Sequence, residues 1–155
     1  MKHASGFTLV ELLIIIGLFT ILSSFAVINL IRPQTKANLD ATVTVLISDI
    51  KEQQLKAMIG DAGGDTPGAY GVYFGTNQYT LFKGSTYSPS DTNNFVVSFQ
   101  GDATSTTTFA SSQVVFSQRS GEVASFSASN NTVTITSSGD AKTITINALG
   151  TISAN

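Results

Sequence analysis

The residues of this chain that could do chemistry lie close to its start. Glu11 is the single charged side chain in the run from Phe7 to Ile31, which is otherwise rich in Leu and Ile. An ionised carboxylate inside a membrane costs on the order of 2.5–3.5 kcal/mol, so such a group normally has a partner. The run contains no Lys, Arg or His that could serve as this partner. Glu11 therefore either snorkels to the interface or pairs with a cation from elsewhere.

The remaining composition offers little for catalysis. The 155 residues include no cysteine, which excludes disulfides and thiolate metal sites, and one histidine, His3. There is no nucleophile elbow, no P-loop and no dinucleotide-binding glycine pattern. Asp61 and Asp65 flank two glycines, but two carboxylates without EF-hand spacing favour a polar loop over a calcium site. The sequence predicts a protein that is not an enzyme and uses no cofactor or metal.

The charge pattern argues against nucleic-acid binding. A protein that binds phosphates needs a basic stripe or patch. Beyond Pro33, nine acidic residues outnumber six basic ones, and the basic residues are scattered along the chain. They are Lys36, Lys51, Lys56, Lys83, Arg119 and Lys142.

The apolar run from Phe7 to Ile31 is long enough to cross a membrane. Its roughly 25 residues would span about 37 Å as a helix, against about 30 Å for the hydrocarbon core. A secretory signal peptide is the simpler interpretation, but its apolar region has only about 7–15 residues and ends at a small-residue cleavage site, for which Ser23 to Ala26 match poorly. Pro33 should kink or loosen the helix where the run ends, because proline lacks a backbone donor.

The segment from Gly6 to Glu11 (GFTLVE), with the apolar run behind it, resembles the class III leader of type IV pilins and type II secretion pseudopilins. The resemblance implies that a prepilin peptidase cleaves after Gly6 on the cytoplasmic side and that Phe7, the new N-terminus, is N-methylated. It also implies that Glu11 of one subunit neutralises the α-amine of Phe7 in a neighbour. Such pairing would favour a single register of packed helices by penalising the others.

One long helix is expected from Phe7 to Ile59. Beyond Pro33, apolar residues recur at three- and four-residue steps, the pattern of an amphipathic helix: Leu39, Val43, Leu46, Ile47, Ile50, Ala57 and Met58. Gly60 and the Gly/Pro-rich segment after it end the helix. The resemblance implies that the apolar stripe packs on a sheet. The predicted fold class is therefore α+β, a type IV pilin-like long helix packed on an antiparallel β-sheet domain.

From Tyr70 onward the sequence alternates as strands do. Strands are expected at Tyr70–Phe74, Gln78–Lys83, Phe95–Gln100, Val114–Ser117, Glu122–Phe126, Thr132–Thr136, Thr143–Asn147 and Thr151–Ser153. The aromatic residues Tyr70, Tyr73, Tyr79, Phe82 and Tyr87 are expected on a sheet face, as core more than as a ligand platform. The segments Val115 to Gly121 and Leu149 to Ile152 resemble the minor pseudopilins, whose β-domain has two stacked sheets.

Four segments follow from these patterns: a leader (1–6), a membrane and filament-core helix (7–31), an amphipathic second half of the helix (32–60) and an extracytoplasmic β-rich head (61–155). The predicted function is a structural subunit, a pilin or pseudopilin, of a type IV pilus or a type II secretion-like filament. Its implied partners are the prepilin peptidase, sister pilins, the cytoplasmic (inner) membrane, and an assembly platform with a motor ATPase that acts indirectly. The subunit would cross the membrane once before it joins a cell-surface or periplasmic filament.

An alternative is a membrane-tethered β-domain that binds a surface, a glycan or DNA without polymerising. A simple tether should tolerate Glu11→Leu, because this change makes its anchor more hydrophobic. A filament subunit that depends on Glu11 should not.

Overall fold

The computed structural model describes residues 7–60 and 67–155, and for residues 25–35 the backbone alone. Helix α1 (Leu9–Ile59) has 51 residues and takes part in two compact units, residues 1–35 and residues 36–155. We call these the N-terminal unit and the globular unit. Gly60 ends the helix with φ of +67°, a left-handed conformation that glycine adopts without a Cβ penalty. The prediction of one long helix that ends at Ile59 is confirmed.

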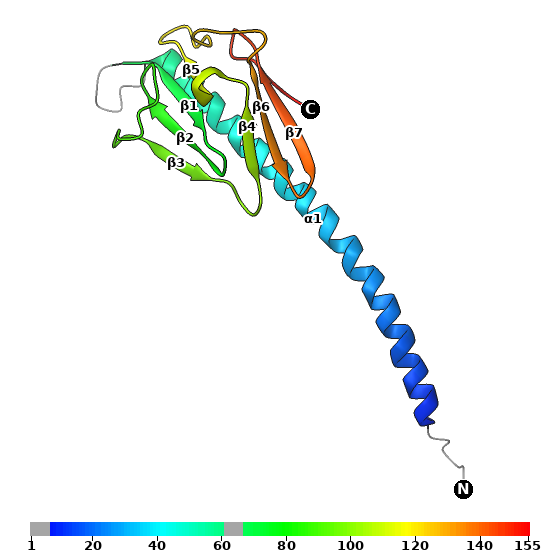
Figure 1. The fold of residues 1–155 in the computed structure, drawn as a ribbon. Coiled ribbons are helices and arrows are strands. Elements are labelled where there is room, and N and C mark those ends of the chain that lie inside the picture. Colours follow the sequence, from blue (N-terminus) through cyan, green and yellow to red (C-terminus); the bar gives the residue numbers. More distant parts are fainter. Residues whose placement is uncertain (1–6, 61–66) are drawn as a thin grey trace. The chain divides into compact units, whose positions relative to one another are not determined.

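The strands of the globular unit form two antiparallel four-stranded sheets (Figure 1). The first sheet has the order β3-β2-β1-β5 and contains β1 (Tyr70–Phe74), β2 (Gln78–Lys83), β3 (Phe95–Ser98) and β5 (Gln113–Phe116). The second has the order β4-β6-β7-β8 and contains β4 (Thr104–Thr107), β6 (Thr132–Ser137), β7 (Asp140–Ile146) and β8 (Ile152–Ala154). A short 3-10 helix, η1 (Ala110–Ser112), precedes β5. The α+β fold with antiparallel sheets is thus confirmed.

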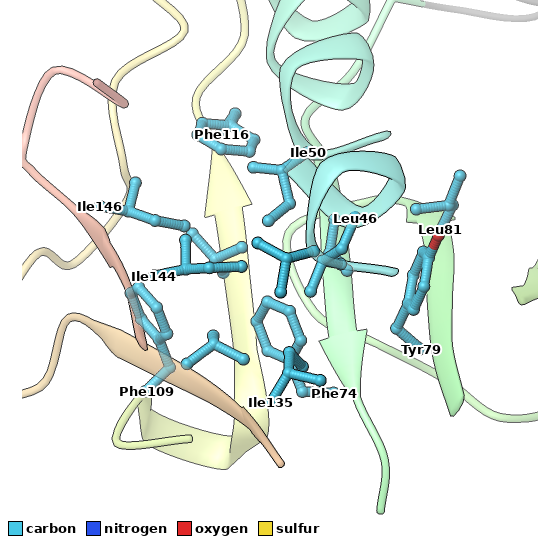
Figure 2. Close-up of a cluster of buried hydrophobic side chains, with 14 of the residues drawn as sticks. Leu46, Ile50, Phe74, Tyr79, Leu81, Phe109, Phe116, Ile135, Ile144 and Ile146 are labelled. Atoms are coloured by element: carbon cyan, nitrogen blue, oxygen red, sulfur yellow. The ribbon is translucent and has the colours of Figure 1, made fainter. Parts of the chain in front are cut away.

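The second half of α1 supplies the helical part of the core. Leu46 and Ile50 are fully buried and lie among side chains from both sheets, including Phe74, Leu81 and Ile144 (Figure 2). The buried helix positions are Leu39, Val43, Leu46, Ile50, Gln53 and Ala57, which follow one another at alternating four- and three-residue steps. The predicted apolar stripe is confirmed with two differences: Met58 is 47% exposed, and the polar residue Gln53 is buried.

The aromatic residues of the first sheet divide between its two faces. Tyr70 and Tyr79 belong to the core. Tyr73 and Tyr87 stack on each other, with ring centroids 4.1 Å apart, and the edge of Phe82 meets Tyr87 at 5.6 Å. The loop between β2 and β3 therefore brings Tyr87 against the face of the sheet opposite the core, and most of this aromatic surface is used for packing.

Two predictions about strands are wrong. The segment Glu122–Phe126 is not a strand, because only Val123 pairs with a strand residue, Phe116, through an isolated bridge. Conversely, the sequence predicts no strand at Thr104–Thr107, but this segment forms β4, which pairs with β6. Its residues have no apolar alternation, and the partners that make it a strand lie far away in sequence.

Candidate functional site

Thr8 sets the start of helix α1. The backbone N–H of Glu11 donates to the Thr8 hydroxyl over 3.2 Å, and the backbone N–H of Leu12 donates to the Thr8 carbonyl over 3.1 Å. Thr8 is therefore the N-cap residue, and Glu11 occupies the third helical position, where a carboxylate suits the positive end of the helix dipole. The signal for this arrangement, Thr-x-x-Glu before an apolar run, is a capping box that the sequence interpretation missed.

The side chains that follow Thr8 have no packing partners within the chain. Every described side chain from Phe7 to Ser24 is exposed, and Phe7 and Leu9 each have 78% of their surface accessible. A continuous apolar surface of this kind marks a site that contacts a protein or a membrane. Glu11 is the one ionisable side chain on this surface.

The polar side chains of the same segment bind its own backbone. The Thr20 hydroxyl donates to the Ile16 carbonyl over 2.8 Å, and the Ser24 hydroxyl donates to the Ile21 carbonyl over 2.7 Å. These hydroxyls have a partner without water, as an apolar environment requires.

Three predictions for the N-terminal segment concern the cleavage residue, the helix kink and the membrane-spanning helix. Gly6, the predicted cleavage residue, lies outside the described residues. Helix α1 passes through Pro33 without interruption, while the predicted kink there stays a prediction. Within the described ranges, no helix reaches the combination of length and hydropathy that crossing a membrane requires.

A polar clasp holds the end of α1 to two loops of the globular unit. The Gln54 amide nitrogen donates to the carbonyls of Gly121 and Leu149, each over 2.9 Å. Gly150 approaches so closely that a Cβ there would lie 2.2 Å from that nitrogen, and its φ is +78°. The segments that resemble minor pseudopilins, around Gly121 and Leu149, thus meet at Gln54, a residue that the sequence interpretation did not single out.

Two carboxylates of α1 connect it to the sheets. The Tyr79 hydroxyl of β2 donates to the Asp49 carboxylate, and the Lys142 ammonium of β7 lies 2.6 Å from the Asp40 carboxylate. Burial, followed by the hydrogen bond to Asp49 and the charge of Asp49, raises the pKa of Tyr79 well above its usual range. These side chains flank the buried stripe, so they contribute to helix–sheet packing and are not simply solvated.

Asp102 organises the turn between β6 and β7. Its carboxylate accepts hydrogen bonds from the Ser137 hydroxyl at 2.6 Å, the Ser138 backbone N–H at 2.7 Å and the Ser138 hydroxyl at 2.8 Å. These bonds, led by that from Ser137, lower the pKa of Asp102, because they favour the charged form. Asp102 thus has a structural role in the turn.

Among the described residues, no three His, Cys, Asp or Glu side chains lie close enough together to hold an ion. Asp61 and Asp65 lie outside the described residues. Of the basic residues beyond Pro33, Lys56 forms an ion pair with Glu52 (2.7 Å), and Lys142 is paired with Asp40.

Comparison with known proteins adds to this geometry. Residues 1–27 match the prokaryotic N-terminal methylation motif. The chain is 41% identical over 56 residues to the type IV wide pilus major component PilA4 of Thermus thermophilus, a match that covers 36% of this chain and 42% of that protein. This chain therefore spans less than half the length of that relative, and no solved structure matches it.

These findings agree with the features of the N-terminal unit. The matched motif contains Phe7, the Thr8 cap and Glu11. It also contains most of the exposed apolar surface, and the globular unit has the α+β architecture expected of a pilin. Residues 1–27 thus carry the N-terminal methylation motif, and the chain is similar to a type IV pilin over 56 residues.

Proposed function

We propose that this chain polymerises through its N-terminal helix as a subunit of a type IV pilus or a type II secretion-like filament. Prepilin peptidase removes residues 1–6, cleaving after Gly6, and Phe7 becomes the N-methylated first residue. The globular unit then forms the outer part of the filament, with sister subunits as its neighbours.

The exposed apolar surface from Phe7 to Ser24 is the observation that carries this proposal. It contains large side chains without packing partners in the chain, whereas the second half of α1 buries a stripe of apolar side chains in the core of the globular unit. Surface of this kind is stable against lipid or against copies of the same helix. The chain therefore moves from a single-pass position in the cytoplasmic membrane to a bundle of sister helices, driven by an assembly platform whose motor ATPase is a separate protein.

Glu11 gives the bundle its register. Cleavage creates a cation, the α-amine of Phe7, and Glu11 follows one helical turn later. Thr8 caps the helix between them and holds the backbone of Glu11 in the first turn. When helices pack side by side, the carboxylate of one and the α-amine of its neighbour neutralise each other, and other registers leave both charges unpaired in an apolar environment.

Filament assembly by Glu11 variants tests the proposal. Glu11→Gln should be inserted and processed normally but should reduce the filament yield by about tenfold or more, because a pairing worth about 1–2 kcal/mol is lost at every subunit. Glu52→Gln is the matched control, since Glu52 lies on the same helix and is exposed. The measurement is the amount of this chain in sheared filaments relative to the processed chain in membranes.

A yield unchanged in Glu11→Gln would contradict the pairing. Normal assembly of Glu11→Leu would also contradict it and would support a β-domain that is merely tethered to the membrane. A loss of yield in Glu52→Gln as well would show that the assay responds to any change in helix charge.

A further inference from the structure

A concave site that no residue of helix α1 lines is present in the globular unit. It is a cavity of about 290 Å³ bounded by the loop after β2, by η1 and β5, and by residues 123–130. Its size is at the lower end of ligand pockets, which enclose about 300–1,000 Å³. It is large enough for a short ligand and not for a folded domain.

The lining of this cavity is polar but uncharged. None of its residues is Asp, Glu, Lys, Arg or His. Hydroxyl and amide groups come from three separate segments: Ser85 and Thr86; Ser111 and Gln113; and Ser125, Ser127 and Asn130. These groups can both donate and accept hydrogen bonds.

The cavity also has aromatic surface. Phe126 lies in its lining and keeps 36% of its surface accessible, so part of its ring can contact a ligand. Phe109 also lines the cavity but is buried and stacks on Phe74 of the core, with ring centroids 6.2 Å apart. One wall of the cavity is therefore anchored in the core and another remains open.

The backbone conformation and one hydrogen bond position the polar groups of the cavity. Ser111 and Ser125 both have φ of +53°, a left-handed conformation that is costly for a residue with a Cβ. The Gln113 amide oxygen accepts a hydrogen bond from the Tyr87 backbone N–H over 2.9 Å, which fixes the orientation of this amide. Ser111, Ser125 and Ser127 are exposed, so their hydroxyls are accessible to a ligand.

We propose that this cavity binds a neutral saccharide. Hydroxyl and amide groups without charge match the hydroxyls of a sugar ring, and the exposed face of Phe126 matches its apolar C–H face. A phosphate or sulfate ligand would require Lys or Arg, and a cation would require carboxylates, neither of which lines the cavity. The site uses no residue of α1, so it is distinct from the helix surface proposed for assembly.

Chemical-shift mapping on the full chain in phosphocholine micelles tests the proposal directly. The probes are cellobiose, maltose and N,N′-diacetylchitobiose at millimolar concentrations, and the comparison ligands are an acidic heparin disaccharide and an uncharged peptide. At least one neutral disaccharide should shift the amide signals of Gln113 and of residues 125–127. Sugar-based detergents are avoided because they would compete.

Ser125→Gly provides the sharper variant, because glycine accepts the positive φ and the change removes the hydroxymethyl side chain without adding backbone strain. We expect the variant to unfold at the same temperature as the parent or higher, and to bind the disaccharide about five- to tenfold more weakly. Ser112→Gly is the matched control, because Ser112 has the same φ of +53° but does not line the cavity. Its affinity should equal that of the parent.

The proposal would be overturned if none of the three neutral disaccharides shifted any signal, or if the shifts were confined to residues outside the cavity. Equal affinity of Ser125→Gly and the parent would also overturn it. So would binding at the cavity by the acidic disaccharide or the peptide alone.

Discussion

The two halves of helix α1 differ in composition and in environment. Leu13 in the first half has 66% of its surface exposed, whereas Leu46 in the second half is fully buried. The first half is almost continuously apolar, and the second carries an apolar stripe with charged residues beside it. Within one regular helix, the sequence pattern thus distinguishes surface that the chain itself buries from surface that needs a partner outside the chain.

The halves also differ in their polar contacts. Polar side chains of the first half bond to their own backbone, as Thr20 and Ser24 do. Those of the second half reach other elements, as Asp40, Asp49 and Gln54 do. These polar side chains of the first half therefore bond within the helix itself, whereas polar contacts of the second half hold it to the rest of the globular unit.

The same substitution in each half gives the largest expected contrast. Leu46→Ala should destabilise the globular unit by about 2–5 kcal/mol, because it leaves a cavity in the core. Leu13→Ala should leave the unfolding of that unit unchanged and reduce filament yield instead. All four tyrosines lie in the globular unit, so thermal unfolding followed by near-UV circular dichroism reports on it. Equal effects of the two changes on this transition would contradict the division of the helix.

Gly150→Ala probes the clasp that holds the second half of α1. We expect a loss of about 2–4 kcal/mol, because the new Cβ combines left-handed strain with a collision that displaces Gln54 from its two hydrogen bonds. Gly139→Ala is the control, because its φ is +89° but a Cβ there meets nothing within 4 Å. It should cost about 1–2 kcal/mol, the strain alone. Equal losses in the two variants would refute the collision.

Tyr79→Phe should cost about 1 kcal/mol through the lost hydrogen bond to Asp49. It should also change the response to alkali. The raised pKa of Tyr79 means that the folded chain keeps this proton when the unfolded chain loses it, at a pH near about 10. The stability that Tyr79 provides is thus fully present below this pH and is lost as the pH rises toward the folded pKa. The free energy of unfolding, measured across this pH range, should fall less steeply in Tyr79→Phe than in the parent. Parallel curves for the two proteins would contradict this role of Tyr79.

Asp102→Asn should have the smallest effect, limited to the turn between β6 and β7. Because its pKa is lowered in the folded chain, Asp102 stabilises the fold above the usual pKa of Asp, about 3.9, and this contribution is lost as the pH falls through the folded value. Acid unfolding of the variant should therefore depend less on pH. The same pH dependence in Asp102→Asn and the parent would contradict this role of Asp102.

The sequence was informative where periodicity and turn chemistry act locally. The stripe through Leu46 and Ile50 and the hairpin between β1 and β2 follow from three- and four-residue steps and from a glycine-containing turn. β4 could not be predicted in this way, because its Ser and Thr residues become a strand only through pairing with β6 and through Ser105, which donates to the Gly75 and Thr76 carbonyls.

The candidate sites show the same limit. Glu11 stood out as the one charge in an apolar run, and its Thr8 cap was readable as a capping box. Gln54 had no local signal, since its partners Gly121 and Leu149 lie 67 and 95 residues away in sequence. The uncharged cavity combines three separate segments of the chain and has no sequence motif.

The most direct test of assembly through the N-terminal helix is the intact mass of this chain in filaments sheared from the producing cells. We expect a subunit that begins at Phe7 and carries one added methyl group. Its abundance then distinguishes a major pilin from a minor pseudopilin. A full-length chain with Met1 to Gly6 still attached, or filaments that never contain this chain although it is processed in the membrane, would contradict assembly through the N-terminal helix.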